Sequence, residues 1–432
     1  MTDVDVVVVG AGPAGACAAT VLARRGRSVL LLERGPFPGS KNMYGGVVYP
    51  RVLDELHPEW WHEVPYQRWV TRRSTMLLTD TQAVTVDYRT EAWGRPPYNG
   101  MTAYRPDFDN WLARKAEADG AQLLCSTTAV GLLRDGERVV GVRTDRPDGD
   151  VSAGVVIACD GVNSFLAKEA GMFGTVDAAN YTVGVKETLA LPKAVIDERF
   201  AVRDREGVDI EILGGTGGVN GGGFIYTNLD TLGVGVVLKL PALAARSTRP
   251  ETIIAGLKAH PAIAPLVDGG EIEEYSAHLI PEAGLTMIPT LAADGMVVAG
   301  DAASLCLAAG IWLEGVNFAM ASGMYAGEAV DEALRAGDVS AAGLAGYERR
   351  LAGTFVLRDH RKLRRIPSLV LSDRVQHEYP QFAANVVERM FRVDNPAPKP
   401  GLRRIVRDER RRAGIRLRDL ARDAWQGMRG FG

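Results

Sequence analysis

The sequence predicts an α/β fold in which a parallel sheet is joined to an antiparallel sheet and to a helical carboxyl-terminal region. Three observations predict this fold. A valine-rich run at 4–9 is followed by an alanine-rich stretch at 14–25 and a second apolar run at 28–34. The middle of the chain alternates apolar and polar residues, as half-buried strands do. Beyond residue 315 the chain becomes alanine-rich with helical periodicity.

The composition is that of a large globular protein without a dominant charge. The 432 residues are 46% hydrophobic and 24% charged, which is enough to build two or three packed units. The formal net charge of −3 gives no field that would hold a nucleic acid, so we expect no nucleic-acid partner. No basic segment with a cleavage site precedes the first apolar run, so we expect a cytoplasmic protein.

The four cysteines are Cys17, Cys125, Cys159 and Cys306, and no two of them form a Cys-x-x-Cys pair. This spacing fits neither a zinc ribbon nor a run that binds an iron–sulfur cluster, so we expect no metal site in the chain. Reduced thiols are the expected state.

The first unit has the pattern of a βαβ motif. The continuous run at 4–9 is typical of a parallel strand buried on both faces, Gly26 ends the helix predicted at 14–25, and 28–34 supplies the next strand. Two further strands of this kind, 154–161 and 295–302, each carry an Asp beside a Gly near their end. One nucleotide-binding domain is therefore assembled from separated segments.

The middle of the chain predicts antiparallel strands. Residues 132–144 contain the turn pair Asp135-Gly136 between two runs, and 221–238 predicts two strands around a polar turn. A proline-rich hinge begins at 395 and leads into an arginine-rich tail. The predicted ranges are 1–75, 100–175 and 285–345 for the nucleotide-binding domain, 76–99 and 176–284 for a sheet-rich substrate domain, and 346–432 for the helical region.

The stretch GAGPAG at 10–15 has the G-x-G-x-x-G spacing between a predicted strand and helix. The first glycine makes the turn, the second lets the backbone approach a pyrophosphate, and the third lets helix and strand pack closely. Glu33 follows Gly15 by 18 residues and is placed to accept from ribose hydroxyls. Its charge repels a 2′-phosphate, which disfavours NADP and leaves FAD or NAD. The alternative is a tight turn that binds nothing. The candidate residues here are Gly10, Gly12, Pro13, Ala14, Gly15, Glu33 and Arg34.

Three downstream segments resemble known flavin-binding segments, and this resemblance favours FAD over NAD. They are YRPDFDNWLARKA at 104–116, VVIACDG ending in Asp160-Gly161, and GMVVAGDAA containing Gly300-Asp301. In this order they resemble the flavin fingerprints of FAD-dependent oxidoreductases, which include aromatic hydroxylases, geranylgeranyl reductases and electron-transfer flavoprotein:quinone oxidoreductases. An Asp at the end of a strand can accept from ribityl hydroxyls, and a helix N-terminus can face the pyrophosphate or the flavin. Each Asp taken alone could instead cap its strand. The resemblance implies FAD contacts from Arg105, Asp160, Gly161, Gly300, Asp301, Gly315 and Val316.

Five longer segments narrow the resemblance to one group of FAD-dependent oxidoreductases. They are 39–50, 183–192, 221–228, 260–284 and 300–323. Along nearly the whole chain they are similar to the FixC-type electron-transfer flavoprotein:quinone oxidoreductases. The resemblance implies a Rossmann-type, GR2-like flavoprotein fold with one FAD. It also implies electrons from a heterodimeric electron-transfer flavoprotein (FixA and FixB), a ferredoxin-like partner (FixX), and a membrane quinone reached from the inner face of the cell membrane. Larger relatives bind an iron–sulfur cluster in a cysteine-rich tail. This chain has no cysteine after Cys306, so the cluster is expected in the separate partner.

The resemblance also suggests residues on the quinone side. Lys41 and Asn42 are candidates to donate to flavin or substrate carbonyls, and Lys186 likewise, although loop bracing is an equal alternative. Gly46 belongs to the same segment. His278 is a candidate proton donor, with a structural histidine as the alternative. Trp312 and Leu313 are candidates to line an apolar quinone path, with core packing as the alternative.

The tail predicts a basic amphipathic helix. Its apolar positions recur at helical spacing while arginines occupy the other faces, and such a helix can lie in the headgroup layer of an anionic membrane. Docking on a partner or packing on its own domain are the alternatives. The apolar positions are Leu417, Leu420, Ala421, Ala424, Trp425 and Met428.

Three other functions remain open at this point. A geranylgeranyl-reductase-like enzyme would use the same FAD domain to saturate isoprenoid double bonds, and an aromatic hydroxylase would need NAD(P)H and oxygen. A non-catalytic FAD-holding protein would tether the electron-transfer flavoprotein to the membrane. Whether the assembly bifurcates electrons to ferredoxin is also open.

Overall fold

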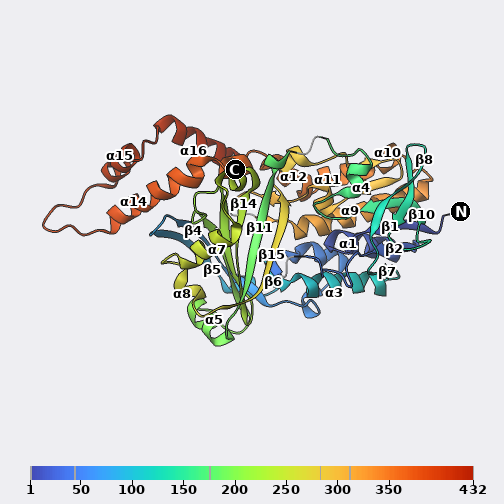
Figure 1. The fold of residues 1–432 in the computed structure, drawn as a ribbon, viewed down its shortest axis with the longest axis horizontal. Helices are drawn as coiled ribbons and strands as arrows, with labels where there is room; N and C mark the ends of the chain where they lie inside the picture. Colours follow the sequence, from blue (N-terminus) through green and yellow to red (C-terminus); the bar gives the residue numbers. More distant parts are fainter. Residues whose placement is uncertain (1, 43–44, 175–176, 283, 311–312, 432) are drawn as a thin grey trace.

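The computed structural model of the protein describes residues 2–42, 45–174, 177–282, 284–310 and 313–431. The amino-terminal sheet with its helices lies at one end of the long axis, and a second sheet lies in the middle (Figure 1). Two helices near the carboxyl terminus, drawn in orange and red, project at the other end.

The first sheet has eight strands, and its central strands are parallel. Its main path runs in the order β16 (Ala292–Ala293), β17 (Met296–Val298), β10 (Val151–Ala158), β1 (Val4–Val9), β2 (Val29–Leu32) and β7 (Gln122–Leu124). A hairpin of β8 (Ala129–Asp135) and β9 (Arg138–Thr144) joins it through β10. β1 is a central strand, and Val6, Val7 and Val8 are completely buried although successive side chains point to opposite faces; both faces are therefore covered here, which explains the unbroken valine run.

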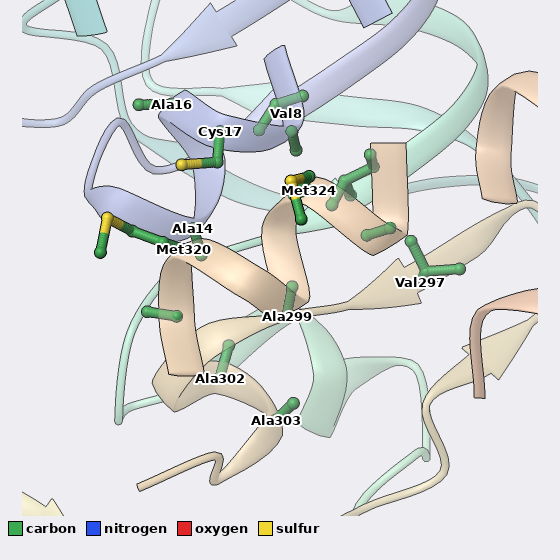
Figure 2. Packing of buried hydrophobic residues seen from close by; sticks show 14 of the residues in the cluster. Val8, Ala14, Ala16, Cys17, Val297, Ala299, Ala302, Ala303, Met320 and Met324 are labelled. Carbon is green, nitrogen blue, oxygen red and sulfur yellow. The ribbon is translucent and has the colours of Figure 1, made fainter. Parts of the chain in front are cut away.

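Helices α1 (Pro13–Arg24) and α9 (Val316–Ala336) pack against each other beside this sheet. Figure 2 shows Ala14 and Cys17 of α1 next to Met320 and Met324 of α9. The backbones approach so closely that a Cβ atom on Gly323 would lie 1.9 Å from the carbonyl oxygen of Ala14. Small residues in both helices therefore permit the contact. On its other side α1 contacts α3 (Arg105–Ala118).

The second sheet has nine strands, and most neighbours are antiparallel. Strands β12 and β4 are the parallel pair. The order is β15 (Glu271–Pro281), β11 (Tyr181–Ala190), β14 (Thr231–Lys239), β13 (Gly221–Thr227), β12 (Glu206–Leu213), β4 (Arg68–Leu78), β6 (Met101–Tyr104) and β3 (Gly45–Val48), with β5 (Ala83–Arg89) beside β4.

One face of this sheet is apolar and covered by helices. Val185 lies opposite Val236, and Ile225 lies opposite both Val234 and Ile210; all five side chains share a buried cluster. The cluster includes residues of α5 (Lys193–Phe200), α7 (Pro250–Ala259) and α8 (Ala264–Val267). Because side chains alternate along a strand, the residues between these positions point to the opposite face. That second face carries polar side chains, as described below.

The remaining elements connect the two sheets and build the carboxyl-terminal region. The helices are α2 (Leu53–Leu56), α4 (Phe165–Glu169), α6 (Leu240–Arg246), α10 (Ala341–Leu344), α11 (Gly346–Gly353), α12 (Phe355–Lys362), α13 (Ile366–Val370), α14 (Tyr379–Phe391), α15 (Leu402–Arg412) and α16 (Leu417–Phe431). Short 3₁₀ helices span η1 (Pro50–Val52), η2 (Trp60–His62), η3 (Glu91–Gly94), η4 (Ala178–Asn180), η5 (Gly284–Met287) and η6 (Gly300–Ala303), and η7 (Arg374–Glu378) is a π-helical turn. A small ladder joins β18 (Leu307–Ala308) to β19 (Leu313–Glu314).

The predicted βαβ unit, the 132–144 hairpin, the 221–238 strand pair and the two late parallel strands are confirmed as elements. The sheet membership of three other strands differs from the predicted domain ranges. Strands β3 and β6 and most of β4 fall in the predicted nucleotide-binding ranges 1–75 and 100–175, but they belong to the nine-stranded sheet. We keep the three-part division as a proposal, with these strands moved to the sheet-rich part.

A buried histidine makes stability depend on pH. His57 is 8% exposed, and its Nδ1 lies 3.3 Å from Nη2 of Arg24. Burial, and then the Arg24 charge, lower the pKa of His57 to about 4 from the 6.5 expected in the unfolded chain. Between these two pKa values the unfolded state binds a proton that the folded state does not bind, so stability falls as pH decreases from about 7 to about 4.

We therefore expect His57→Gln to lose less stability than the parent protein over this pH range, as measured by urea unfolding at several pH values. His62→Gln, at an exposed histidine nearby, is the matched control and is expected to follow the parent curve. Parallel curves for the parent protein and His57→Gln would contradict the assignment.

Candidate functional site

A cavity of about 410 Å³ lies between the two sheets. Residues that follow the carboxyl ends of the parallel strands form one wall: Gly10 after β1, Glu33 after β2, Asp160 after β10 and Gly300 after β17. The facing wall comes from the polar face of the nine-stranded sheet and includes Val237, His278 and Ile280. The carboxyl edge of a parallel sheet is where α/β folds bind their ligands.

The three glycines of the turn after β1 have different surroundings. Gly10 has φ +98°, and a Cβ there would lie 2.3 Å from the carbonyl oxygen of Cys159. A Cβ on Gly15 would lie 1.9 Å from the carbonyl oxygen of Gly10, so this glycine serves packing and does not line the cavity. Gly12, at the N-cap of α1, lines the cavity, and nothing lies within 4 Å of its Cβ position. The helix N-terminus thus opens onto free space that suits an anion.

Glu33 joins two turns at the edge of the cavity. One carboxylate oxygen accepts from the backbone N–H of Ala11 at 3.2 Å, and the other from Gly35 at 2.7 Å. Burial raises its pKa. A carboxylate has acceptor capacity beyond these two bonds, so the predicted contact to ribose hydroxyls is retained as a proposal.

Two buried acceptors at the cavity have no partner within the described part of the protein. Asp160 Oδ2 accepts from the backbone N–H of Leu166 at 3.1 Å, while its Oδ1 is orphaned. Asn317 donates from Nδ2 to Glu314 at 2.5 Å, while its Oδ1 is orphaned. Both residues line the cavity. Because buried polar atoms are nearly always paired, these atoms indicate that a ligand with donor groups belongs here.

Arg105 and Asn42 converge on one buried carboxylate. Arg105 donates from Nε and Nη2 to the two oxygens of Asp109, each at 2.8 Å, and Asp109 has no exposed side-chain surface. Asn42 donates from Nδ2 to the same carboxylate at 2.8 Å. The amide of Asn42 therefore braces the Arg105–Asp109 pair, which is the alternative weighed against a donor role toward flavin or substrate. Lys41 is exposed and lines the cavity.

His278 and Asp301 contribute from facing walls. Burial lowers the pKa of His278, and the Asp301 carboxylate opposes that shift. Burial raises the pKa of Asp301, and His278 and Arg105 oppose it. Both side chains line the cavity, so they can exchange hydrogen bonds with a ligand held between them.

The other candidate residues fall into three groups. Pro13, Ala14, Arg34, Gly161, Gly300, Gly315, Val316 and Leu313 line the cavity. Gly46 in β3 does not line it, and Lys186 is buried away from it, where Nζ donates to the Gly45 carbonyl at 3.0 Å and to the Tyr226 hydroxyl at 3.2 Å. Lys186 thus has the bracing role. Trp312 lies outside the described residues.

Two family matches cover different parts of the chain. Residues 3–202 match the FAD binding domain, and residues 367–432 match the ETF-QO/FixC family C-terminal domain. A probable electron transfer flavoprotein-quinone oxidoreductase of Escherichia coli K12, YdiS, is 38% identical over 95% of both chains. The chain belongs to the ETF-QO/FixC family.

Two relatives named Protein FixC also match nearly the whole chain. The one from Escherichia coli K12 is 38% identical over 98% of both chains, and the one from Bradyrhizobium diazoefficiens is 39% identical over 90% of both. Among solved structures, a geranylgeranyl bacteriochlorophyll reductase-like protein from Thermoplasma acidophilum has a TM-score of 0.72 at 20% identity, covering 96% of this chain and 99% of its own. The flavin-dependent brominase Bmp2 has a TM-score of 0.64 at 17% identity, covering 95% and 99%. These two structures show the fold.

FAD is the cofactor of this ETF-QO/FixC family member, and the cavity fits it. The open position at Gly12 and the N-terminus of α1 suit a pyrophosphate. The orphaned oxygen of Asp160 suits a hydroxyl donor, and α9 begins at Val316 on the cavity wall, where its N-terminus can face negative charge on a flavin.

Sequence reasoning missed several residues of the cavity wall. Tyr49 and Glu282 line the cavity near strand ends, and Glu314 and Asn317 flank the start of α9. Burial raises the pKa of Glu282 to about 7. The available signal for Glu314 and Asn317 is their position on either side of the candidate pair Gly315-Val316. Tyr49 and Glu282 lie within the segments 39–50 and 260–284, which carry the family resemblance, but the resemblance assigned neither residue a role.

Proposed function

We propose that the protein is a FAD-dependent electron-transfer flavoprotein:quinone oxidoreductase. It takes electrons from an electron-transfer flavoprotein and passes them toward quinone. The observation that carries this proposal is the 38% identity, over 95% of both chains, to a relative with that printed name. The cavity between the two sheets, with its fit to FAD, supplies the physical site.

The residues of the chain have distinct tasks in this function. Bound FAD supplies a centre that accepts and releases one or two electrons. Gly12 and the N-terminus of α1 would hold its pyrophosphate, Asp160 Oδ1 would accept from its polyol, and Arg105, fixed by Asp109, would supply positive charge on the cavity wall. Val237 and Ile280 of the nine-stranded sheet and Leu313 of β19 give the cavity an apolar wall that would suit a quinone ring.

The partners of this reaction include a separate iron–sulfur protein. The four cysteines are dispersed along the sequence without the spacing of a cluster-binding run, and the resemblance to FixC-type proteins implies a ferredoxin-like partner. The chain therefore contributes the flavin, and the ferredoxin-like partner contributes the cluster.

Contact with an anionic membrane brings the site to its quinone. Helix α16 is anchored through Asp423, which accepts from Arg374 of η7 and from the hydroxyl of Tyr379 at the start of α14. Its predicted apolar stripe faces outward, with Leu417 65% and Met428 66% exposed. The hairpin of α14 and α15 projects from the body (Figure 1) and carries further exposed apolar side chains: Met390, Phe391, Val393 and Leu402. No helix among the described residues is long and apolar enough to cross a bilayer.

We expect Leu417→Ser combined with Met428→Ser to weaken binding to phosphatidylglycerol-containing vesicles by about tenfold or more, because each side chain contributes about 1.5–3 kcal/mol when buried. Vesicle flotation measures the effect. Val86→Ser with Ile272→Ser, at exposed apolar positions on β5 and β15, is the control and is expected to bind normally. Equal binding by both double variants would contradict the assignment of this surface.

Steady-state kinetics test the function. Purified protein with reduced electron-transfer flavoprotein is expected to reduce a soluble ubiquinone analogue, with a rate that depends on both substrates. NADPH alone, or a geranylgeranyl lipid in place of the quinone, is expected to give no turnover. Saturation of the prenyl lipid, or oxygen consumption with NADPH, would assign the chain to the reductase or hydroxylase functions. Binding of the flavoprotein without turnover would indicate the non-catalytic tether.

A further inference from the structure

A buried cluster of charged residues lies on the polar face of the nine-stranded sheet. Arg73 of β4 lies beside Asp209 and Glu211 of β12, with Arg73 Nε 3.3 Å from Asp209 Oδ2 and Arg73 Nη2 in contact with Glu211. Their side chains are 19%, 8% and 12% exposed, respectively. Two carboxylates thus share one guanidinium in a setting that is nearly closed to water.

The strand register explains why these groups meet. Asp209 and Glu211 alternate with Val208, Ile210 and Ile212, which belong to the apolar cluster on the opposite face. Arg73 lies directly beside Asp209 in the parallel ladder. The charged residues therefore point to the same side of the sheet as Val237 and His278 of the cavity wall.

The charge count favours one retained proton in this cluster. Full ionisation would leave a net negative charge in a poorly solvated place, and burying a charge without a partner is costly. Burial, and then the neighbouring Asp209, raise the pKa of Glu211 to about 8. Burial raises the pKa of Asp209 to about 6, although Arg73 opposes the shift. The pair thus exchanges a proton near neutral pH.

Tyr49 connects the cluster to the cavity. It lines the cavity, and the guanidinium carbon of Arg73 lies 5.6 Å from the centre of its ring. Burial, and the charges of Asp209 and Glu211, raise the pKa of Tyr49 well above its ordinary value, so its hydroxyl keeps its proton. A neutral hydroxyl can accept one proton and donate another.

Other titratable groups face the cluster from the elements around it. Glu314, beside α9, adds negative charge that raises the pKa of both Tyr49 and Glu211. Tyr226 of β13 lies opposite Asp209 in register, and Tyr88 of β5 lies opposite Arg73. Glu282 lines the cavity from the end of β15. Arg73 is the cation in direct contact with the pair, and Lys186 bonds to Tyr226 beyond it.

We propose that the Asp209–Glu211 pair, positioned by Arg73, supplies one of the two protons for quinone reduction in the cavity, through the hydroxyl of Tyr49. The inference rests on the proposed quinone reductase function. A quinone that gains two electrons and two protons forms two O–H bonds. The electrons come from the electron-transfer flavoprotein through the bound cofactor, one proton leaves the carboxyl pair, and the second comes from water. The pair regains its proton from solvent through Glu211, whose side chain is 12% exposed.

Two measurements on Glu211→Gln test the proposal. In the parent protein, reoxidation of the reduced flavin by a soluble quinone is expected to slow as pH rises through about 8. In the variant this inflection is expected to disappear and the step to slow by about 100-fold, within the range for a lost general acid. Reduction of the flavin by the electron-transfer flavoprotein is expected to be unchanged.

A proton titration of the two apoproteins provides a readout that needs no turnover. Glu211→Gln is expected to release one proton fewer than the parent between about pH 6 and pH 9, while the titration of Glu282, with its pKa of about 7, persists in both. Glu273→Gln, an exposed position on β15, is the control and is expected to match the parent in both measurements.

Tyr49→Phe keeps the ring and tests the connection even if Glu211→Gln does not fold. It is expected to slow the quinone step as much as Glu211→Gln does while the apoprotein titration stays like the parent's. A parent-like pH profile in either variant overturns the proposal. A parent protein that titrates as expected but passes no electrons to quinone refutes the proposed function, and with it the role of the pair.

Discussion

Replacing Gly12 with valine is expected to give a folded protein that retains no FAD. Gly12 has φ −74° and ψ −174°, a conformation that valine adopts readily, and nothing lies within 4 Å of its Cβ position. The added side chain would occupy the space where the backbone must approach a pyrophosphate. The visible spectrum and the FAD-to-protein ratio after purification measure the loss, and circular dichroism checks the fold.

Two further glycine variants show whether loss of FAD depends on the position of the added side chain. Gly256→Val, at an open position in α7, is the control and is expected to keep full FAD. Gly15→Val is expected to disturb folding itself, because its Cβ would lie 1.9 Å from the carbonyl oxygen of Gly10. Stoichiometric FAD in Gly12→Val would mean that the pyrophosphate does not lie at the N-terminus of α1.

Replacing Asp331 with alanine is expected to lower the free energy of unfolding by about 1.5–3 kcal/mol, the range for hydrogen bonds to a charged group. Asp331 of α9 has no exposed side-chain surface and pairs with Arg25 at 3.1 Å, Arg27 at 2.8 Å and Arg335 at 3.0 Å. Burial alone would raise its pKa, but the bonds from Arg27 and Arg25 outweigh burial and lower it. The substitution leaves these guanidiniums without their shared partner and releases α9 from the segment that follows α1.

The neighbouring residue provides a matched control. Glu332 of the same helix is 54% exposed and pairs with Arg350, so Glu332→Ala is expected to cost at most about 1 kcal/mol. Urea unfolding of both variants, with FAD in excess, measures the difference. Similar losses in the two variants would show that the ion pairs of the buried Asp331 carboxylate do not hold α9 in place.

Short sequence patterns were enough to predict the nucleotide-binding part of the fold. The valine run of β1, the glycine spacing and the strand ends at Asp160 and Asp301 depend on neighbours close in sequence. The cavity gathers Gly10, Gly12, Asp160 and Asp301 because parallel strands end at one edge of a sheet.

The features that the sequence did not predict depend on contacts between strands and side chains that are far apart in the sequence. Strands β3, β4 and β6 pair with one another and with β12, and nothing in their own residues indicates which sheet they join. The amide of Asn42 bonds to Asp109, a partner 67 residues away. Asp209 and Glu211 alternate with apolar residues, which predicts a shared face, but only the register places Arg73 beside them.

The most direct test of the central claim is an anaerobic spectroscopic titration of the purified protein. Reduced electron-transfer flavoprotein is expected to bleach the flavin absorbance, and a soluble quinone is expected to restore it, while NADPH alone does neither. Bleaching by NADPH, or a reduced flavin that oxygen or a prenyl lipid reoxidises and quinone does not, would contradict the account.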